Sequence, residues 1–297
     1  MPTNFDEAAF RRSLSYSSTA TPSEVLRDLD AIRNLDANAE HNNHFWNLVI
    51  AGCVLVLLAA IPAMMAELVV VAMLLGTAGL ISLCVSIGRK VHNNRLDVAN
   101  RRYELVTEVL GYLGKDIGPD ETVTVQIDFR PHNHKAKFDR KGKAGKWNVK
   151  YFVDTWLTLS GRLMDGTKFN ISMIEKHQDR SRRSTSRSGK TKWKSKTKGS
   201  SEAILQLKVK PRRYPNLSAF AGTADANAFQ LPPSINVKAF FADDETVRLR
   251  TTSAMQWDVY PIQERPGKHD GVTWLATKLM TLYGLLNSAR QSAKGAS

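Results

Sequence analysis

The sequence predicts an α+β membrane protein with a two-helix transmembrane hairpin, a helical stalk, a mainly antiparallel β cytoplasmic domain and a C-terminal helix. Three observations indicate this fold class. Residues 45–88 are almost all apolar, residues 123–209 contain runs in which apolar and polar side chains alternate, and leucines repeat at helical spacing after residue 270. The segments expected from these patterns are 1–44, 45–88, 89–114, 115–268 and 269–297.

The apolar segment 45–88 is about twice as long as the roughly 20 residues that one helix needs to cross a bilayer. Its only charged residue is Glu67. Two helices, at about 45–64 and 68–88, fit this length with a turn at 64–67. A helical hairpin buried in a soluble protein rarely continues so far with a single charge, so this segment is predicted to span a membrane twice.

Basic residues lie on one side of the predicted hairpin. Five of them follow the second helix, whereas the turn contains no lysine or arginine; the five are Arg89, Lys90, Arg95, Arg101 and Arg102. Because positively charged flanks tend to stay in the cytoplasm, both chain ends are predicted to be cytoplasmic and the turn to face outward. We therefore expect a multi-pass protein of the cell (inner) membrane.

Small residues recur at helical spacing in the second predicted helix, at Ala72, Gly76, Ala78, Ser82 and Ser86. Such residues let membrane helices approach closely, so they either pack the hairpin on itself or form a subunit interface or the wall of a pore. Two helices cannot enclose a water-filled path, so a channel would have to be a homo-oligomer. Glu67 then either rings the pore mouth or keeps the turn at the aqueous interface.

Further helical segments are expected on either side of the hairpin. Residues 1–20 are expected to be polar and mobile. Thr21 is predicted to cap an amphipathic helix at 22–40, because a proline and a glutamate follow it in the order typical of helix starts. The apolar spacing after residue 89 predicts that the second membrane helix continues as a cytoplasmic stalk to about Leu113.

Alternating residues predict the strands of the β domain. Asp165-Gly166, between two alternating runs, is a strong signal for a tight hairpin turn. Asp270 is predicted to cap the last helix, which carries leucines on one face. Strands are expected at 123–129, 157–163, 169–173 and 203–209, with weaker ones near 247–250 and 257–260.

The net charge of +14 is unevenly distributed along the chain. Residues 1–44 carry a net −3, whereas the chain from Arg89 onward carries +18. Two connectors between expected strands hold most of this charge: residues 130–150 carry a net +7 and residues 177–200 a net +8. Such concentrated positive charge attracts polyanions, so nucleic acid or a nucleotide oligomer is the expected partner.

The candidate ligands for a polyanion are the basic residues of these two connectors and the tryptophans among them. Trp147 is interpreted either as a core residue at a strand start or as a stacking surface, and Trp193 as a contact residue. Anionic lipid headgroups are an alternative partner, and a solvated segment without a partner is a second alternative. The candidates are Lys135, Lys137, Arg140, Lys141, Lys143, Lys146, Trp147, Arg180, Arg182, Arg183, Arg187, Lys190, Lys192, Trp193, Lys194, Lys196 and Lys198.

Motifs for metal binding or catalysis are incomplete in this sequence. The segment 188–191 (Ser-Gly-Lys-Thr) resembles the end of a phosphate-binding P-loop, but Ser184 stands where that motif needs glycine. His132 and His134 are spaced like metal ligands on a strand, but the neighbouring lysines and arginine would repel a cation. No pair of a nucleophile and a base is recognisable. We therefore expect no metal, no cofactor and no enzymatic activity.

In its organisation, with a hairpin at 45–88 followed by a basic domain, the chain resembles two-helix membrane effectors of bacterial antiphage defence, such as the channel subunits of Hailong-type systems. In some of these effectors a cytoplasmic domain responds to a nucleotide or DNA-oligomer signal. The resemblance implies an oligomeric channel gated by a polyanion, and it transfers no individual residue. The alternative is a non-conducting membrane anchor whose basic segments hold lipid, nucleic acid or a protein partner.

Overall fold

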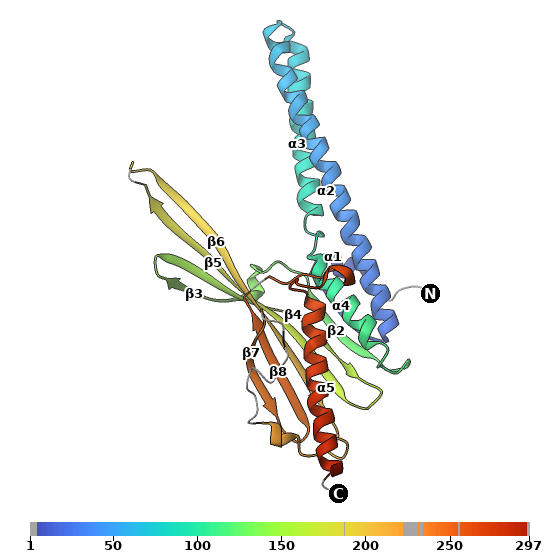
Figure 1. The fold of residues 1–297 in the computed structure, drawn as a ribbon. Coiled ribbons are helices and arrows are strands. Elements are labelled where there is room, and N and C mark those ends of the chain that lie inside the picture. Colours follow the sequence, from blue (N-terminus) through green and yellow to red (C-terminus); the bar gives the residue numbers. More distant parts are fainter. Residues whose placement is uncertain (1–4, 187, 222–230, 232–233, 255, 296–297) are drawn as a thin grey trace. The chain divides into compact units, whose positions relative to one another are not determined.

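The computed structural model describes residues 5–186, 188–221, 231, 234–254 and 256–295. The chain divides into two compact units: Asp28–Asn100, and Met1–Arg27 together with Arg101–Ser297. The first unit is helical, and the second combines an antiparallel sheet with helices (Figure 1). The α+β class predicted from the sequence is therefore confirmed.

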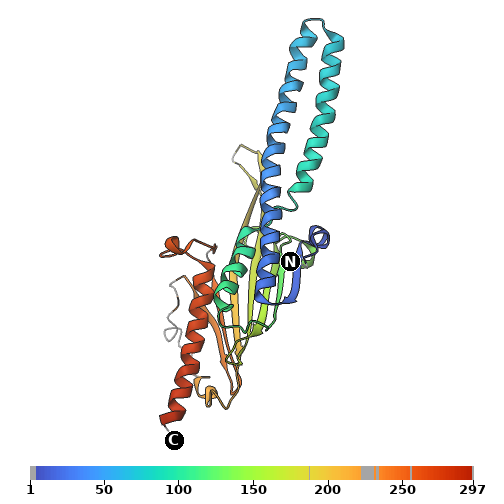
Figure 2. The ribbon, with the colours of Figure 1, turned by 90° about the vertical axis from the view of Figure 1, so that its right-hand side faces the viewer.

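The helical unit consists mainly of α2 (Pro22–Met65) and α3 (Val69–Asn93), which run antiparallel side by side (Figures 1 and 2). Both helices are long and apolar enough to cross a membrane, judged by length and composition. The turn lies close to the predicted place, with Glu67 in the left-handed region at a φ of 61°. The sequence predicted an amphipathic helix at 22–40 and a separate membrane helix at about 45–64, and this separation is wrong. One helix continues throughout, because no proline or glycine occurs between residues 23 and 51.

Small residues of α3 line its contact with α2. Ala72, Gly79 and Ser86 are buried at intervals of seven residues, the spacing of a closely packed left-handed helix pair. A Cβ atom added to Gly79 would lie 2.9 Å from Cδ2 of Leu57 on α2. Of the small residues singled out in the sequence, Ala72 and Ser86 therefore pack the hairpin on itself.

The remaining predicted packing residues are not part of this contact. Ala78 and Ser82 are exposed on α3, and a Cβ atom added to Gly76 would meet nothing within 4 Å in the described chain. Ala78 and Ser82 are thus small residues on the exposed surface of α3, and Gly76 is half-buried. Glu67 is exposed in the turn.

The predicted continuous stalk is interrupted. α3 ends at Asn93, residues 94–99 are not helical, and α4 (Asn100–Leu113) is a separate helix. The backbone N–H of Val98 donates to Oδ1 of Asp36 at 2.8 Å, so a side chain replaces the carbonyl that a continuous helix would offer. The apolar periodicity of both helices was interpreted correctly, but it does not reveal the break between them.

The α+β unit is built on one antiparallel sheet with the strand order β1-β2-β4-β5-β6-β8-β7 and with β3 beside β4. The prediction of a mobile N-terminus is wrong for the described residues, because α1 (Glu7–Ser13) is followed by an edge strand that pairs with β2. The strands are β1 (Ser15–Ala20), β2 (Val123–Asp128), β3 (Phe138–Ala144), β4 (Trp147–Arg162), β5 (Lys168–Thr185), β6 (Thr191–Lys208), β7 (Asn236–Ala242) and β8 (Thr246–Ser253).

One face of the sheet forms the core with α4 and α5 (Gly271–Gly295), which lie on the same side of it (Figures 1 and 2). Nε1 of Trp274 on α5 donates to Oγ1 of Thr251 on β8 at 2.9 Å. Nζ of the buried Lys278 donates to the carbonyl of Ala203 on β6. The apolar residues on this face include Val125, Ile127, Leu157, Leu159, Ile171, Met173, Leu205, Leu207 and Leu249.

Several local predictions in this unit are confirmed. β4 and β5 are joined at the predicted hairpin turn, where Gly166 has a φ of 85°. Asp270 caps α5, accepting the backbone N–H of Thr273 at 2.6 Å. The weak strand expected near 257–260 is wrong, since this segment forms only an isolated bridge between Asp258 and Asp270.

Candidate polyanion-binding site

The two basic connectors are mostly strands rather than loops. β3 and the start of β4 form most of residues 130–150, and the outer parts of β5 and β6 form most of residues 177–200. Together they form an extension that projects beyond the rest of the sheet (Figure 1). We call this extension the basic arm; it comprises β3 with residues 147–152 of β4, 176–185 of β5 and 191–200 of β6.

The strand register sorts the charges of the basic arm onto two faces. Residues directly opposite each other in an antiparallel ladder point to the same face, and residues two apart along a strand also share a face. On β5, counting by twos from the buried Met173 leads to His177 and Asp179, which therefore lie on the helix-covered face. Arg180 and Arg182 lie on the other face, which we call the open face.

The open face of the basic arm carries a dense set of cations. Arg180 pairs with Lys196 and Arg182 with Lys194 across the β5–β6 ladder. On β6 the lysines occupy every second position, about 6.8 Å apart along the strand. Lys176 lies on this face at the base of the arm and is paired with Glu202 at 2.7 Å. The other cations of the open face are Arg140, Arg180, Arg182, Lys192, Lys194, Lys196 and Lys198.

Little negative charge neutralises the open face. Within the described part of the chain, the one salt bridge of these seven cations joins Arg140 to the adjacent Asp139, and both side chains are exposed. Lys192, Lys194 and Lys198 are exposed. Uncompensated like charges at this density repel one another, and a bound polyanion would relieve that repulsion.

The ring of Trp147 packs against two cations of the open face. Its ring is half-buried on the same face, with the Arg182 guanidinium 4.5 Å and the Lys196 ammonium 4.6 Å from the ring centroid. Cation–π contacts of this kind hold long side chains in place. The sequence left open whether Trp147 is a core residue or a free stacking surface. In the structure it is neither, because its ring is half-buried and in contact with two cations.

Trp193 is the exposed aromatic residue of the basic arm. It lies opposite Arg183 near the β5–β6 turn, on the helix-covered side of the ladder, and its relative exposure is 74%. Such a ring is open for stacking on a base or for contact with a membrane interface.

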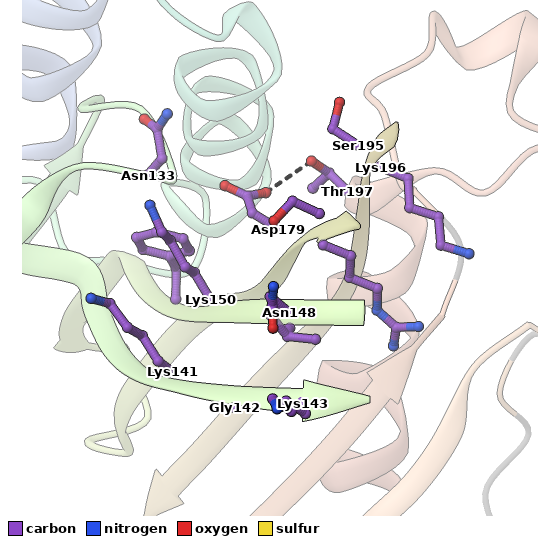
Figure 3. Close-up of a pocket in the computed structure, with 14 residues that line it drawn as sticks. Asn133, Lys141, Gly142, Lys143, Asn148, Lys150, Asp179, Ser195, Lys196 and Thr197 are labelled. Carbon is purple, nitrogen blue, oxygen red and sulfur yellow. Dashed lines mark hydrogen bonds between the residues drawn. The ribbon is translucent and has the colours of Figure 1, made fainter. Parts of the chain in front are cut away.

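The other face of the basic arm contains a hollow of about 860 Å³. Lys141, Lys143 and Lys150 line it together with polar residues of β5 and β6 (Figure 3). Oδ1 of Asp179 accepts a hydrogen bond from Oγ1 of Thr197 at 2.8 Å in this hollow. With a carboxylate among three lysines, this face is less strongly cationic than the open face.

Not every predicted ligand is available to a polyanion. Lys137 is buried, with Nζ 2.9 Å from Oδ2 of Asp154, and it donates to the carbonyl of Arg130. Burial lowers the pKa of Lys137. The prediction is therefore corrected for Lys137, which is a structural residue. Arg187 lies outside the described residues.

The other predicted ligands lie at the margins of the basic arm. Lys135 is exposed in a short 3-10 helix, Lys135–Lys137, that precedes β3. Lys146 is exposed in the β3–β4 turn, and Lys190 in the β5–β6 turn. Their positions permit contact with a long polyanion that extends past the open face.

The two histidines considered as metal ligands do not converge. Nε2 of His132 lies 3.2 Å from Oδ1 of Asp179, and its ring is tilted by 30° against that of His177, with the ring centroids 4.5 Å apart. Nδ1 of His134 instead accepts the backbone N–H of Ala136 and caps the 3-10 helix.

A buried charge network at the base of the basic arm was missed in the sequence. Arg101 and Arg102, at the start of α4, donate to the two oxygens of Glu175 on β5 at 2.7 and 3.1 Å. Arg102 also donates to Oδ2 of Asp154 at 2.8 Å. Burial alone would raise the pKa of Glu175, but the hydrogen bond from His177 and the charges of both arginines lower it to about 2. One feature of the sequence could have indicated this network, because the acidic residues Asp154 and Glu175 interrupt the otherwise apolar alternation of β4 and β5.

Comparisons with protein-family models, with curated proteins and with solved structures gave no match.

Proposed function

We propose that this chain is a membrane-anchored effector whose basic arm binds a polyanion, either a nucleic acid or a nucleotide oligomer. The observation that carries the proposal is the open face, where strand register gathers seven cations besides Lys176, and the one salt bridge of these seven within the described chain is to Asp139. Phosphate binding by such a face releases counterions and supplies affinity without sequence specificity.

The form of the basic arm favours a chain-like ligand. Lysines at every second position of β6 form a straight row that a phosphate backbone can follow over several nucleotides. Trp147 preorders Lys196 in that row and Arg182 on the neighbouring strand, which reduces the entropy lost on binding. Trp193 adds an exposed ring near the β5–β6 turn, on the opposite face, where a ligand that continues around the turn can stack an unpaired base.

We further propose that several copies assemble around α2 and α3 and that ligand binding gates a channel between them. The length and apolar composition of both helices support membrane insertion. The small, exposed residues Ala78 and Ser82, with the half-buried Gly76, are suited to close packing between copies. The alternative is a membrane anchor that does not conduct, and ionic current across a bilayer separates the two.

The binding proposal is tested with the full-length protein in nanodiscs of zwitterionic lipid and fluorescent oligonucleotides, by anisotropy over a range of salt concentrations. One variant changes Lys192, Lys194, Lys196 and Lys198 to serine. The matched control changes Lys141, Lys143, Lys150 and Arg183 to serine, which removes the same charge from the opposite face. We expect the first variant to bind more weakly than the control and to reduce the salt slope by about 0.7 for each phosphate that is no longer neutralised.

Three results would contradict the proposal or redirect it. Equal weakening in both variants would mean that total charge, and not the open face, determines binding. Binding to anionic vesicles without any salt-sensitive binding to oligonucleotides would overturn the nucleic-acid assignment and favour lipid headgroups. Oligonucleotide binding without any ligand-dependent current in planar bilayers would leave the anchor and exclude the channel.

A further inference from the structure

The hollow on the helix-covered face of the basic arm is lined by polar side chains that strand pairing places in two rows. Residues directly opposite each other in neighbouring strands share a face, so each row can be followed from β3 through β4 and β5 to β6. The outer row, nearer the turns, runs from Lys143 through Asn148 and Ser181 to Ser195, and all four residues are exposed. One ammonium group in this row is therefore accompanied by amide and hydroxyl groups that donate hydrogen bonds.

The inner row of the hollow contains two lysines side by side. It runs from Lys141 through Lys150 and Asp179 to Thr197 (Figure 3). Lys141 and Lys150 are directly opposite each other on β3 and β4, which is unfavourable for like charges. Asp179 pairs with His132 at 3.2 Å and accepts from Thr197 at 2.8 Å, and among the described residues the two lysines have no salt bridge. An anion bound in the hollow would relieve their repulsion.

The next row toward the core is aromatic. Phe138 on β3 is opposite Phe152 on β4, which is opposite His177 on β5. The ring centroids of Phe138 and Phe152 are 5.9 Å apart, and the ring of His132 meets Phe152 edge-on at 6.1 Å. Phe152 is buried, whereas Phe138 has a relative exposure of 42%. An exposed ring beside a cationic hollow is suited to stacking on the base of a nucleotide whose phosphates bind the lysines.

We propose that the hollow binds a nucleoside di- or triphosphate. Lys141, Lys143 and Lys150 neutralise its phosphates, and its base stacks on Phe138. The carboxylate of Asp179 is placed between the lysines and the aromatic row, where it can accept a hydrogen bond from a ribose hydroxyl. The hollow has a volume of about 860 Å³, which falls within the range of about 300–1,000 Å³ that is usual for small-molecule sites.

This nucleotide site differs from the open face in both position and ligand. Lys141 and Arg140 are adjacent on β3 and therefore point to opposite faces of the sheet. The open face offers a long row of cations, whereas the hollow combines three lysines with hydroxyl and amide groups and an aromatic ring in a compact space. Nucleotide binding in the hollow is therefore independent of polyanion binding by the open face, and either can be absent without the other.

The test uses the full-length protein in nanodiscs of zwitterionic lipid, titrated calorimetrically with the non-hydrolysable ATP analogue AMP-PNP at physiological salt, where distant charges are screened. The hollow variant changes Lys141, Lys143 and Lys150 to serine. The matched control removes the same charge from the open face by changing Lys192, Lys194 and Lys198 to serine. We expect one AMP-PNP to bind per chain, with an affinity at least about tenfold lower in the hollow variant and nearly unchanged in the control.

A further variant tests the base. Phe138→Ala should weaken AMP-PNP about tenfold and leave the affinity for inorganic tripolyphosphate unchanged, because only the nucleotide has a base that can stack. Unchanged tripolyphosphate binding also shows that the hollow of this variant is still folded.

Several outcomes would overturn the nucleotide site. Absence of binding heat for AMP-PNP into the millimolar range, together with an unchanged unfolding temperature on its addition, would exclude it. Equal affinity in the wild type and the hollow variant, or equal losses in the hollow variant and its control, would show that the ligand does not bind in the hollow. Tripolyphosphate that binds as tightly as AMP-PNP would overturn the assignment of a nucleoside. Oligonucleotide binding by the same variants tests the open face separately.

Discussion

Nη2 of Arg101 lies 2.7 Å from Oε1 of Glu175, and this ion pair connects two stretches that are 74 residues apart in the chain. Arg101 is the first residue after the helical unit, and Glu175 directly precedes the part of β5 that belongs to the basic arm. Arg102 binds the other oxygen of the same carboxylate. The two arginines therefore tie the start of α4 to the base of the basic arm.

Removing the shared carboxylate should destabilise the α+β unit. Glu175→Gln leaves Arg101 without its acid and takes one of two acids from the buried Arg102. Loss of one partner in a buried network costs about 3 kcal/mol in free energy of unfolding. Urea unfolding followed by tryptophan fluorescence measures this, and the exposed Glu121→Gln should serve as a near-neutral control. A destabilisation no greater than the control's would show that the network contributes nothing to stability.

The same network predicts how stability depends on pH. The pKa of Glu175 is about 2 in the folded chain and 4.5 without its partners, so the folded state binds fewer protons between these values. Its contribution is fully present above pH 4.5 and is lost as the pH falls toward 2. Wild type and Glu175→Gln should therefore converge in unfolding free energy over this range. A difference that stays constant down to pH 2 would contradict the assignment.

Glu202 should act in the same direction. Burial would raise its pKa, but hydrogen bonds from Lys176, Lys238 and Arg250 lower the pKa to about 2. Because its three basic partners are partly exposed, salt should weaken this contribution more than that of Glu175. Acid unfolding of Glu202→Gln at low and high salt would show the difference, and salt-independent behaviour would refute it.

The two tryptophans of the basic arm should differ in their effects on binding. Trp193→Ala removes an exposed ring and should selectively weaken the binding of single-stranded oligonucleotides, by about 1–3 kcal/mol in binding free energy. Trp147→Ala removes the ring that holds Arg182 and Lys196 in place, and it should weaken the binding of single-stranded and double-stranded oligonucleotides alike. Anisotropy with matched oligonucleotides distinguishes the two patterns. An unchanged single-strand preference in Trp193→Ala would exclude base stacking at that position.

Two glycines of α3 separate packing within the hairpin from packing between copies. Gly79→Leu should disturb the hairpin itself, because even a Cβ atom there would meet Leu57 at 2.9 Å. A Cβ atom added at Gly76 meets nothing within 4 Å in the described chain, so Gly76→Leu should disturb the hairpin less than Gly79→Leu and should weaken association between copies. Thermal unfolding and size-exclusion chromatography with light scattering in detergent measure these effects. A wild type that is strictly monomeric would exclude the channel.

The orientation in the membrane is testable by cysteine labelling after Cys53 and Cys84 are replaced with alanine. The exposed Glu67 in the turn and the exposed Ser188 in the β5–β6 turn provide the two reporter positions. An impermeant thiol reagent should label Glu67→Cys in intact cells and should label Ser188→Cys only after lysis. The opposite pattern would reverse the predicted topology.

Features that depend on local patterns were predictable from the amino-acid sequence. Apolar composition predicted α2 and α3, alternation predicted the strands of the core, and Asp165-Gly166 and Asp270 predicted a turn and a cap. These succeed because helix length, strand alternation and capping depend on residues close together in the chain. The continuous α2 and the break at 94–99 were missed, because they depend on a missing helix breaker and on a bond from Asp36.

The positions at which charged side chains meet depend on the folding of the chain and could not be predicted from its sequence. The basic segments were predicted as loops because their composition is polar, yet pairing with neighbouring strands makes them a sheet extension and places seven cations on one face. The same pairing buries Lys137 beside Asp154. The fold also brings Asp97 to Asp36 and Glu40, some sixty residues earlier. Composition fixes how much charge a chain carries, but strand register and long-range packing determine which charges become neighbours.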